Sequence, residues 1–383
     1  MNFEHDKLLT IAVIGAGVSG LSVASLLAMA GHEVTIFEKN PEISEIGAGI
    51  QISPNGFCVL KAIGLSQNTI KNSICNSSIL ICDYLNGKKL LQFEQSSVLG
   101  NRNFRLMHRA DLIEMLYRSA VTNKVKFKLG QTVDAKSLSC QYSFVIAADG
   151  VHSKTRALLN PKQIKSERSN YFAWRATVPN KINHHEGVRL TVAPKKHVVS
   201  YPVRDGSQLN LVLIQEIENN DFFEWSIKER PEDIKGIFSE FGGNLKEGLE
   251  SIETVHKWGL SSHDIAVNWA VENIFLIGDA LHPMLPFLAQ GANSALEDSF
   301  VLARLITRLD PIEAAERYAE IRKPRLLRLI KQIKNNAWKF HLEHSFLRTC
   351  THNGLRFLDT TFPQSASLSF RWLYNYDVTK LNI

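Results

Sequence analysis

Three glycines near the start of the chain have the spacing of a phosphate-binding turn. Gly15, Gly17 and Gly20 follow an apolar run at residues 11–14, and Glu38 lies 18 residues after the last glycine. In such a pattern the first glycine permits a tight turn, the second lets backbone approach a pyrophosphate, and the third allows a helix to pack closely on a strand. The acid at the end of the next strand accepts hydrogen bonds from a ribose. The pattern predicts a site for an adenine dinucleotide, but it does not choose between FAD and NAD.

Two later apolar runs also end in turn-forming residues. Residues 144–148 are followed by Asp149-Gly150, and residues 273–277 by Gly278-Asp279. In open α/β sheets, ligands bind beyond the carboxyl ends of the strands, where such turns lie. We therefore expect both turns at the ligand-binding edge of one sheet. Asp149-Gly150 alone is equally consistent with an ordinary turn, because an Asp-Gly pair favours one.

The elements that would position these turns alternate between strand and helix. Residues 11–14 and 33–37 predict buried strands, and residues 18–30 predict a helix packed on them through small and aliphatic side chains. Ser294 and Glu297 fit a capping box, which predicts that a further helix begins there.

The middle of the chain has a different pattern. Alternating residues at 171–178, 197–201 and 209–215 predict strands of an antiparallel sheet. This sheet would form a second domain, inserted into the first.

The turn at Gly278 belongs to a longer motif. Gly278-Asp279-Ala280-Leu281-His282-Pro283, followed by Gln290-Gly291-Ala292-Asn293, resembles the second flavin fingerprint of class A flavoprotein monooxygenases. These are aromatic hydroxylases related to para-hydroxybenzoate and salicylate hydroxylases. The resemblance extends from about residue 11 to residue 325, and residues 372–377 resemble the salicylate-hydroxylase tail. The other segments that agree are Gly47-Ala48-Gly49-Ile50-Gln51, Met107-His108-Arg109-Ala110-Asp111-Leu112, Ala148-Asp149-Gly150-Val151-His152-Ser153, Tyr201-Pro202-Val203-Arg204 and Arg322-Lys323-Pro324-Arg325.

This resemblance implies that the dinucleotide is FAD. Asp279 would bind the ribityl or nearby pyrophosphate region, with a capping role as the alternative. Arg109 would bind the phosphate side, which suits a guanidinium, with a surface salt bridge as the alternative. The backbone at residues 291–293 would approach the isoalloxazine, where the positive end of a helix stabilises the anionic reduced flavin. The expected FAD-binding residues are Gly15, Gly17, Gly20, Glu38, Lys39, Gly49, Arg109, Asp149, Asp279, Gly291, Ala292 and Asn293.

The fold that the resemblance implies is a Rossmann-type three-layer α/β FAD-binding domain, with an inserted antiparallel β-rich substrate domain and C-terminal helices. The predicted FAD-binding domain comprises residues 1–75, 101–168 and 258–345. The predicted substrate domain comprises residues 76–100 and 169–257, and residues 346–383 form a C-terminal helical tail.

The activity that the resemblance implies is hydroxylation of a small aromatic substrate, such as a phenolic acid or a hydroxypyridine. In this family NADH or NADPH reduces FAD, O2 forms a flavin C4a-hydroperoxide, and the bound ring takes the distal oxygen. The sequence holds no second Gly-x-Gly-x-x-Gly unit, so NAD(P)H would dock transiently. Lys154 and Arg156 are candidate contacts for it, or ordinary solvated charges. Two other functions stay open: an FAD-dependent reductase or dehydrogenase that does not use oxygen, and a flavin-binding partner or regulator without catalysis.

The predicted catalytic residues are His197, Tyr201 and Pro286. His197 and Tyr201 lie four positions apart on one predicted strand, so they share a face of the sheet. A histidine there could act as base toward a substrate phenol, because its pKa lies near neutrality, and a tyrosine could hydrogen-bond the same hydroxyl. The alternative is a pair of half-buried sheet residues. Pro286 falls where the family places a backbone carbonyl or a polar side chain above the flavin. Further candidates for the pocket wall, or for the core, are Trp174, Arg175 and Phe287.

Composition limits the partners, the metal content and the cellular compartment that we expect. The 383 residues carry a net charge of +6, which suits anionic ligands but is far from a nucleic-acid-binding signature. The five cysteines are widely spaced and no zinc-type spacing occurs, so we expect reduced thiols, no metal and a cytoplasmic protein. Residues 8–31 are uncharged but interrupted by glycines, unlike a secretory leader, and no convincing transmembrane span is present. Oligomeric state is open, with a homodimer among the alternatives.

A basic stretch lies near the C-terminus. Residues 317–339 contain eight Lys or Arg residues and a single acid, Glu320. We expect a solvated helical face, with contact to an anionic membrane or a partner as the alternative.

Overall fold

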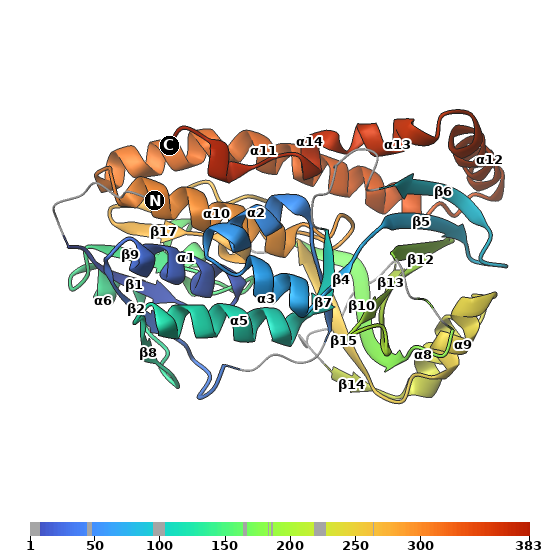
Figure 1. The fold of residues 1–383 in the computed structure, drawn as a ribbon, viewed down its shortest axis with the longest axis horizontal. Coiled ribbons are helices and arrows are strands. Elements are labelled where there is room, and N and C mark those ends of the chain that lie inside the picture. Colours follow the sequence, from blue (N-terminus) through green and yellow to red (C-terminus); the bar gives the residue numbers. More distant parts are fainter. Residues whose placement is uncertain are drawn as a thin grey trace.

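The computed structural model describes residues 8–43, 48–94, 104–163, 167–182, 184, 187–217, 227–262 and 264–383. Two large sheets lie side by side, and the long helix α11 (Pro311–Phe340) runs along one side of the molecule past both of them (Figure 1). The architecture confirms the expected Rossmann-type domain, β-rich domain and C-terminal helices. Gly47, part of one family segment, lies outside the described residues.

The six-stranded sheet contains the predicted βαβ unit. Its strand order is β16-β17-β9-β1-β2-β8, and every pairing except that of β16 with β17 is parallel. The strands form because short apolar runs are buried on both faces of a parallel sheet. Their bounds are β1 (Thr10–Ile14), β2 (Glu33–Phe37), β8 (Lys126–Lys128), β9 (Phe144–Ala147), β16 (Ala270–Val271) and β17 (Ile274–Leu276).

The eight-stranded sheet has the order β14-β15-β10-β13-β12-β11-β5-β6 and is antiparallel except where β11 pairs with β5. The predicted strands of the middle region lie within β10, β12 and β13. The domain boundaries remain a prediction, and the one at residues 257/258 falls inside β15. The bounds are β5 (Ser78–Asp83), β6 (Lys89–Glu94), β10 (Glu167–Pro179), β11 (Val188–Ala193), β12 (Lys196–Val203), β13 (Gln208–Glu216), β14 (Ile227–Glu229) and β15 (Val255–Ser262). A small third sheet joins β3 (Gly49–Ile52), β7 (Arg105–His108) and β4 (Ile74–Cys75).

Helices cover the sheets and close the chain. Those of the first domain are α1 (Val18–Met29), α2 (Pro54–Ala62), α3 (Ser66–Lys71), α5 (Arg109–Thr122), α6 (Ala135–Ser139), α7 (Lys154–Leu159) and α10 (Gly291–Ile306). The β-rich domain carries α8 (Pro231–Ile237) and α9 (Asn244–Glu250), and a 3-10 turn, η1 (Gly278–Ala280), follows β17. After α11 come α12 (Ser345–Thr361), α13 (Pro363–Ser369), α14 (Arg371–Tyr374) and η2 (Val378–Lys380).

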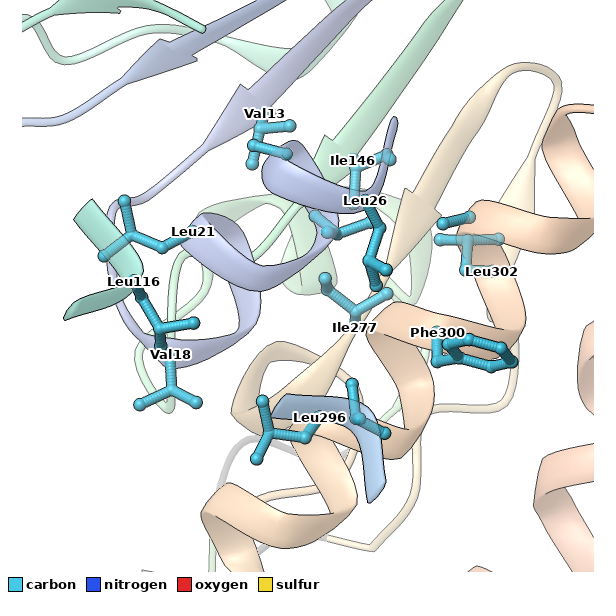
Figure 2. Packing of buried hydrophobic residues seen from close by; sticks show 14 of the residues in the cluster. Val13, Val18, Leu21, Leu26, Leu116, Ile146, Ile277, Leu296, Phe300 and Leu302 are labelled. Atoms are coloured by element: carbon cyan, nitrogen blue, oxygen red, sulfur yellow. The ribbon is translucent and has the colours of Figure 1, made fainter. Parts of the chain in front are cut away.

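The main core lies between the six-stranded sheet and helices α1, α5 and α10. Aliphatic side chains from the strands meet those of the helices at close range, as Figure 2 shows. Its labelled members are Val13, Val18, Leu21, Leu26, Leu116, Ile146, Ile277, Leu296, Phe300 and Leu302. Helix α1 is buried along most of its length, which explains its nearly continuous apolar sequence.

The predicted capping box at Ser294 is wrong. Helix α10 begins at Gly291, and the Ser294 backbone N–H donates to the Gln290 carbonyl, so Ser294 lies in the first helical turn. The Glu297 side chain does not cap the helix, because it is buried in an ion pair with another helix. The Glu297 of the Ser-x-x-Glu pattern therefore serves the ion pair between helices and not a helix cap.

A buried ionic cluster joins α10 to α11. Glu297, Asp298 and Arg322 are fully buried, and Arg322 donates to Glu297 at 2.6 Å and to Asp298 at 2.8 Å. Arg325 donates two hydrogen bonds to Glu297, both at 2.7 Å. Although burial alone would raise the pKa of Asp298, His282 and Arg322 lower it to about 2. Both acids are therefore held as carboxylates inside the protein.

The same cluster holds the C-terminal tail. Arg325 donates to the backbone carbonyls of Trp372 and Leu373, and its guanidinium lies 3.9 Å from the ring centroid of Tyr376. Arg328 lies over the Trp372 ring. The expectation of a solvated basic face is thus wrong for Arg322 and Arg325, which pair inside the fold, whereas Arg328 and the other basic residues of the stretch are exposed.

Replacing Arg322 tests the cluster. In an Arg322→Ala variant both buried carboxylates lose the guanidinium that they share, so we expect a loss of about 3–5 kcal/mol in the free energy of unfolding. Denaturant titration measures the change. Arg317→Ala is the control, because Arg317 pairs with Glu320 at the surface and should change stability by less than about 1 kcal/mol. Equal losses in the two variants would contradict the assignment.

Candidate functional site

The carboxyl ends of four adjacent parallel strands place the predicted cofactor residues in a row. Strand β1 pairs with β2 on one side and with β9 on the other, and β9 pairs with β17. Glu38, Gly15, Asp149 and Gly278 follow these strands in the order β2, β1, β9, β17. Three strand spacings separate the ends of this row, roughly 14 Å. An extended dinucleotide can lie along such an edge.

The three glycines have the geometry that their spacing predicts. Gly15 has φ +100°, and a Cβ atom there would lie 2.4 Å from the Ala148 carbonyl oxygen. A Cβ at Gly20 would lie 1.9 Å from the Gly15 carbonyl oxygen, so the α1 backbone packs directly on the turn. At Gly17 no atom of the described residues, its chain neighbours aside, lies within 4 Å of the Cβ position. The middle glycine therefore faces open space, where a pyrophosphate could approach the backbone.

Glu38 is tied to the glycine turn. Its carboxylate accepts hydrogen bonds from the backbone N–H groups of Ala16 and Asn40, both at 2.9 Å. These bonds hold the half-buried carboxylate at the end of β2, where a ribose could reach it. Lys39 is exposed next to it.

Asp279 lies at the other end of the row, in the turn η1 after β17. Gly278 has φ +58° and its backbone N–H donates to Asp298, so the buried cluster holds the turn. Desolvation raises the pKa of Asp279, while His282 and Arg109 lower it. Because Asp279 is exposed to solvent at this edge, water weakens both the desolvation and the charge effects. Arg109 is the first residue of α5, and its positive charge acts on Asp279.

Asp149 has a structural role that the sequence left open. Its carboxylate accepts hydrogen bonds from the Thr155 backbone N–H at 3.2 Å and from the Thr155 hydroxyl at 3.1 Å, which anchors the start of α7. Its Oδ1 atom is buried without a hydrogen-bond partner in the described part of the chain. Asp149 can therefore stabilise the turn with one carboxylate oxygen and still offer the other to a ligand. Arg156 is buried and donates to the carbonyls of Asp264 and Leu281, so it is not a solvated charge.

The start of α10 faces the region between the two domains. Gly291 and Ala292 are half-buried, and nothing lies within 4 Å of the Gly291 Cβ position. The Asn293 side chain is fully buried, accepts from the Ser53 N–H and donates to the carbonyls of Gln51 and Ala289. Its side chain thus binds protein, and only its backbone is left for a cofactor.

Gly49 and Tyr201 form one contact between the domains. A Cβ at Gly49 would lie 2.6 Å from the Tyr201 ring, and the Gly49 N–H donates to Asn210 at 2.6 Å. Gly49 is therefore covered by side chains of the β-rich domain, and its predicted cofactor contact remains untested. Burial raises the pKa of the Tyr201 hydroxyl well above its usual value, so it stays protonated.

The residues at this edge fit FAD. Gly17, Gly150 and Gly291 all leave open space at the Cβ position. Gly17 and Gly291 lie at the starts of α1 and α10, where helix N-termini favour phosphate and other anionic groups, and Gly150 lies in the turn between β9 and α7. Side chains at Glu38 and Asp279 bracket the row.

An apolar cavity of about 570 Å³ lies between the eight-stranded sheet and the C-terminal helices. Pro286, Phe287 and Ala289 line it directly before the α10 N-terminus, so it adjoins the expected isoalloxazine position. His197 is also in its wall, but Tyr201, Trp174 and Arg175 are not. Trp174 packs in a separate core on the other face of the sheet. Other lining residues are Leu91, Leu190, Val199, Phe340, Leu355 and Tyr374.

His197 is buried among rings. Its Nδ1 lies 2.7 Å from Nε2 of His341, the residue that ends α11, and the rings of Phe287 and Phe340 flank it. Burial lowers the pKa of His197 well below its ordinary value, and His341 acts in the same direction. The imidazole is therefore neutral. His341 and the walls contributed by α12 and α13 were missed, because no local pattern in the sequence marks them.

The described residues were also searched for metal sites and for membrane-spanning helices. They contain no group of three or more His, Cys, Asp or Glu side chains arranged to hold a metal ion. His282, the histidine of the flavin motif, is buried against Asp298. A search of the same residues finds no helix with the length and apolarity needed to cross a membrane.

Two glycine variants separate cofactor binding from folding. Gly17→Ala should fold normally, because its methyl group meets open space, but should weaken FAD binding at least tenfold by blocking the pyrophosphate approach. Gly20→Ala should lower the melting temperature even without FAD, since its methyl group collides with the Gly15 carbonyl. Flavin absorbance and thermal denaturation measure the two effects. Full FAD retention in Gly17→Ala would contradict the assignment of Gly17 to the pyrophosphate site.

Replacing Asp279 tests the other end of the row. Asp279→Ala should weaken FAD retention, because the residue faces the ligand edge and its side chain has no place in the core. Flavin content after gel filtration gives the readout, with Glu272→Ala on the preceding surface turn as the control. Equal flavin content in both variants would remove Asp279 from the site.

Comparison with known proteins supports the cofactor and the fold. Residues 117–331 match a family model described as FAD binding domain, and residues 13–56 match an NAD(P)-binding Rossmann-like domain. A structure of Klebsiella pneumoniae HpxO complexed with FAD and uric acid has a TM-score of 0.80 at 20% identity, covering 96% of this chain and 99% of that one. A salicylate hydroxylase substrate complex has a TM-score of 0.78 at 20% identity, covering 98% and 97%.

Relatives of similar length give the enzyme class. The chain is 31% identical over 392 residues to a 3-amino-4-hydroxybenzoate 2-monooxygenase from Streptomyces cremeus, covering 96% of this chain and 95% of the relative. It is 26% identical to a 3-hydroxybenzoate 6-hydroxylase from Klebsiella oxytoca, covering 89% and 95%. With the two-part flavin site, these matches show that the chain belongs to the family of FAD-dependent aromatic monooxygenases.

Proposed function

We propose that this monooxygenase hydroxylates a small phenol that carries a further polar substituent, of the hydroxybenzoate or aminohydroxybenzoate class. The observation that carries the proposal is the apolar cavity that adjoins the α10 N-terminus and has a buried, neutral histidine in its wall. Its volume of about 570 Å³ admits a single ring with substituents. The names of the relatives describe hydroxylation of such rings, which favours oxygen-dependent chemistry over a reductase or a non-catalytic partner.

The chain's own residues would hold FAD along the sheet edge. The glycine turn and Arg109 bind its phosphates, Glu38 its ribose and Asp279 its ribityl region, and the start of α10 points at the ring system. Lys39, Gly49 and Asp149 complete the set of proposed FAD contacts. When bound, FAD reduced by NADH or NADPH reacts with O2 and supplies the oxygen atom that enters the substrate. The protein's part is to orient the phenol and to exclude bulk water.

His197 is the base in this proposal. A neutral imidazole in the cavity wall accepts the phenol proton, and the resulting phenolate has a more electron-rich ring for oxygen transfer. Tyr201 packs on Gly49 and fixes the sheet against β3, which makes it a positioning residue. Pro286 has no side-chain donor, so it shapes the cavity end beside the flavin.

The setting of the enzyme is also part of the proposal. We infer a cytoplasmic enzyme, because its five cysteines form no disulfide and three of them are exposed. NADH or NADPH would dock on the surface without a nucleotide-binding unit of its own. A homodimer remains a prediction, which gel filtration with light scattering tests.

A substrate panel tests the reaction. Purified protein should be yellow and should consume NAD(P)H with hydroxybenzoates, aminohydroxybenzoates and hydroxypyridines, and mass spectrometry should find a product heavier by one oxygen. Product must be measured, because NAD(P)H loss alone also reports uncoupled turnover. Turnover that continues without O2 would indicate a reductase instead.

Replacing His197 tests the base. His197→Ala should slow hydroxylation at neutral pH by about 10²-fold or more, the usual contribution of general base catalysis, with FAD content unchanged. His256→Ala is the matched control, since His256 lies on β15 outside the cavity wall. An unchanged rate and coupling in His197→Ala would remove it from the catalytic residues.

A further inference from the structure

Three side chains from distant parts of the chain form a hydrogen-bonded line that begins at the cavity. His197 on β12 contacts His341 at the end of α11 through Nδ1 and Nε2, 2.7 Å apart. His341 Nδ1 lies 3.2 Å from Oε2 of Glu216 at the end of β13. His341 thus contacts its two neighbours through different ring nitrogens, and His197 uses only its Nδ1.

The line leads from the cavity to solvent. His197 lines the apolar cavity, whereas His341 and Glu216 line a second hollow of about 620 Å³ on the other side. Both imidazoles are buried, and the Glu216 side chain is 36% exposed. A proton that reaches Glu216 can therefore pass to water without crossing the apolar cavity.

The carboxylate sets the tautomer of both rings. Ionised Glu216 can only accept, so His341 must carry its proton on Nδ1 and present the lone pair of Nε2. His197 must then donate from Nδ1, and its Nε2 lone pair remains for the cavity. If both hydrogen bonds ran in the opposite direction, His197 would carry its proton on Nε2 and could not act as a base toward the cavity.

We propose that His341 and Glu216 are a proton relay and positioning pair that lets His197 deprotonate the phenol; this rests on the proposed function. The phenol proton moves to His197 Nε2 as the Nδ1 proton of His197 moves to His341 Nε2. The Nδ1 proton of His341 then moves to Glu216, which releases it to water in the second hollow. One proton enters and one leaves, so neither imidazole has to hold a positive charge in the buried site. The product phenolate then takes a proton back from His197 Nε2 as the shifts run in reverse from water through Glu216 and His341, which restores the Nε2 lone pair of His197.

Other charged and titratable groups surround the line without completing it. Tyr171 of β10 meets the His341 ring edge to face, and burial, with a smaller contribution from Glu216, raises the pKa of its hydroxyl to about 12. Lys195 pairs with Glu343 at 3.2 Å, and the remaining groups of the second hollow are Lys334 and His344. On the cavity side the uncharged rings of Phe287 and Phe340 flank His197, and the titratable groups elsewhere in the cavity wall include Glu94, Lys339 and His352.

The pH dependence of hydroxylation distinguishes a relay from a merely structural contact. Glu216→Gln removes the carboxylate, and His341→Phe replaces the middle ring by one that cannot transfer a proton. We expect both variants to lower kcat at pH 7 by about 10²-fold with a smaller change in KM. The loss should shrink toward pH 10, where a phenol ionises without help because its pKa is about 10. The best substrate of the panel serves as the probe.

The controls make each outcome decisive. Glu343→Gln removes a carboxylate from the same hollow outside the line and should keep the unaltered pH profile. If His341→Phe loses its FAD, Glu216→Gln carries the test, because its side chain is partly exposed. Unchanged kcat in Glu216→Gln, or a loss that is equal at pH 7 and pH 10, would overturn the relay. If the unaltered protein forms no hydroxylated product with any member of the panel, the proposed function itself fails.

Discussion

The pairing of Glu297 and Asp298 with Arg322 and Arg325 is the interaction on which the arrangement of the site depends. Burying each charge costs several kcal/mol, and only close pairing offsets that cost. Because the two acids are adjacent on α10, the cluster fixes that helix in both rotation and position. Asp298 also binds the Gly278 N–H, so the turn that carries Asp279 is held by the same group.

Helix α11 extends this constraint from the cofactor edge to the cavity. Near its middle, Arg322 and Arg325 bind α10, and toward its end Asn336 donates to the Phe287 carbonyl in the cavity wall. The helix then ends at His341, against His197. A change in the ionic cluster would therefore alter the distance between the flavin edge and the base. The C-terminal tail, bound by Arg325, closes part of the same cavity through Tyr374.

The cavity owes its chemistry to the contrast between apolar walls and a few polar groups. Aliphatic side chains of β5, β6, β11 and β12 face aromatic and aliphatic side chains of α11 and α12. In such surroundings an imidazolium is unfavourable, which keeps His197 neutral. A neutral base with a route to solvent suits the removal of one proton from a phenol.

The sequence by itself determined the features that depend on short stretches of chain. A left-handed φ at Gly15, the contact between Gly20 and the turn, and an acid at the end of β2 are local requirements, so spacing alone predicted them. The tertiary structure alone decided the rest. It showed that Ser294 caps nothing, that Trp174 belongs to another core, and that His341 and Glu216 meet His197. Side chains brought together across more than a hundred residues leave no periodic trace in the chain, because their contact is set by how helices and sheets pack.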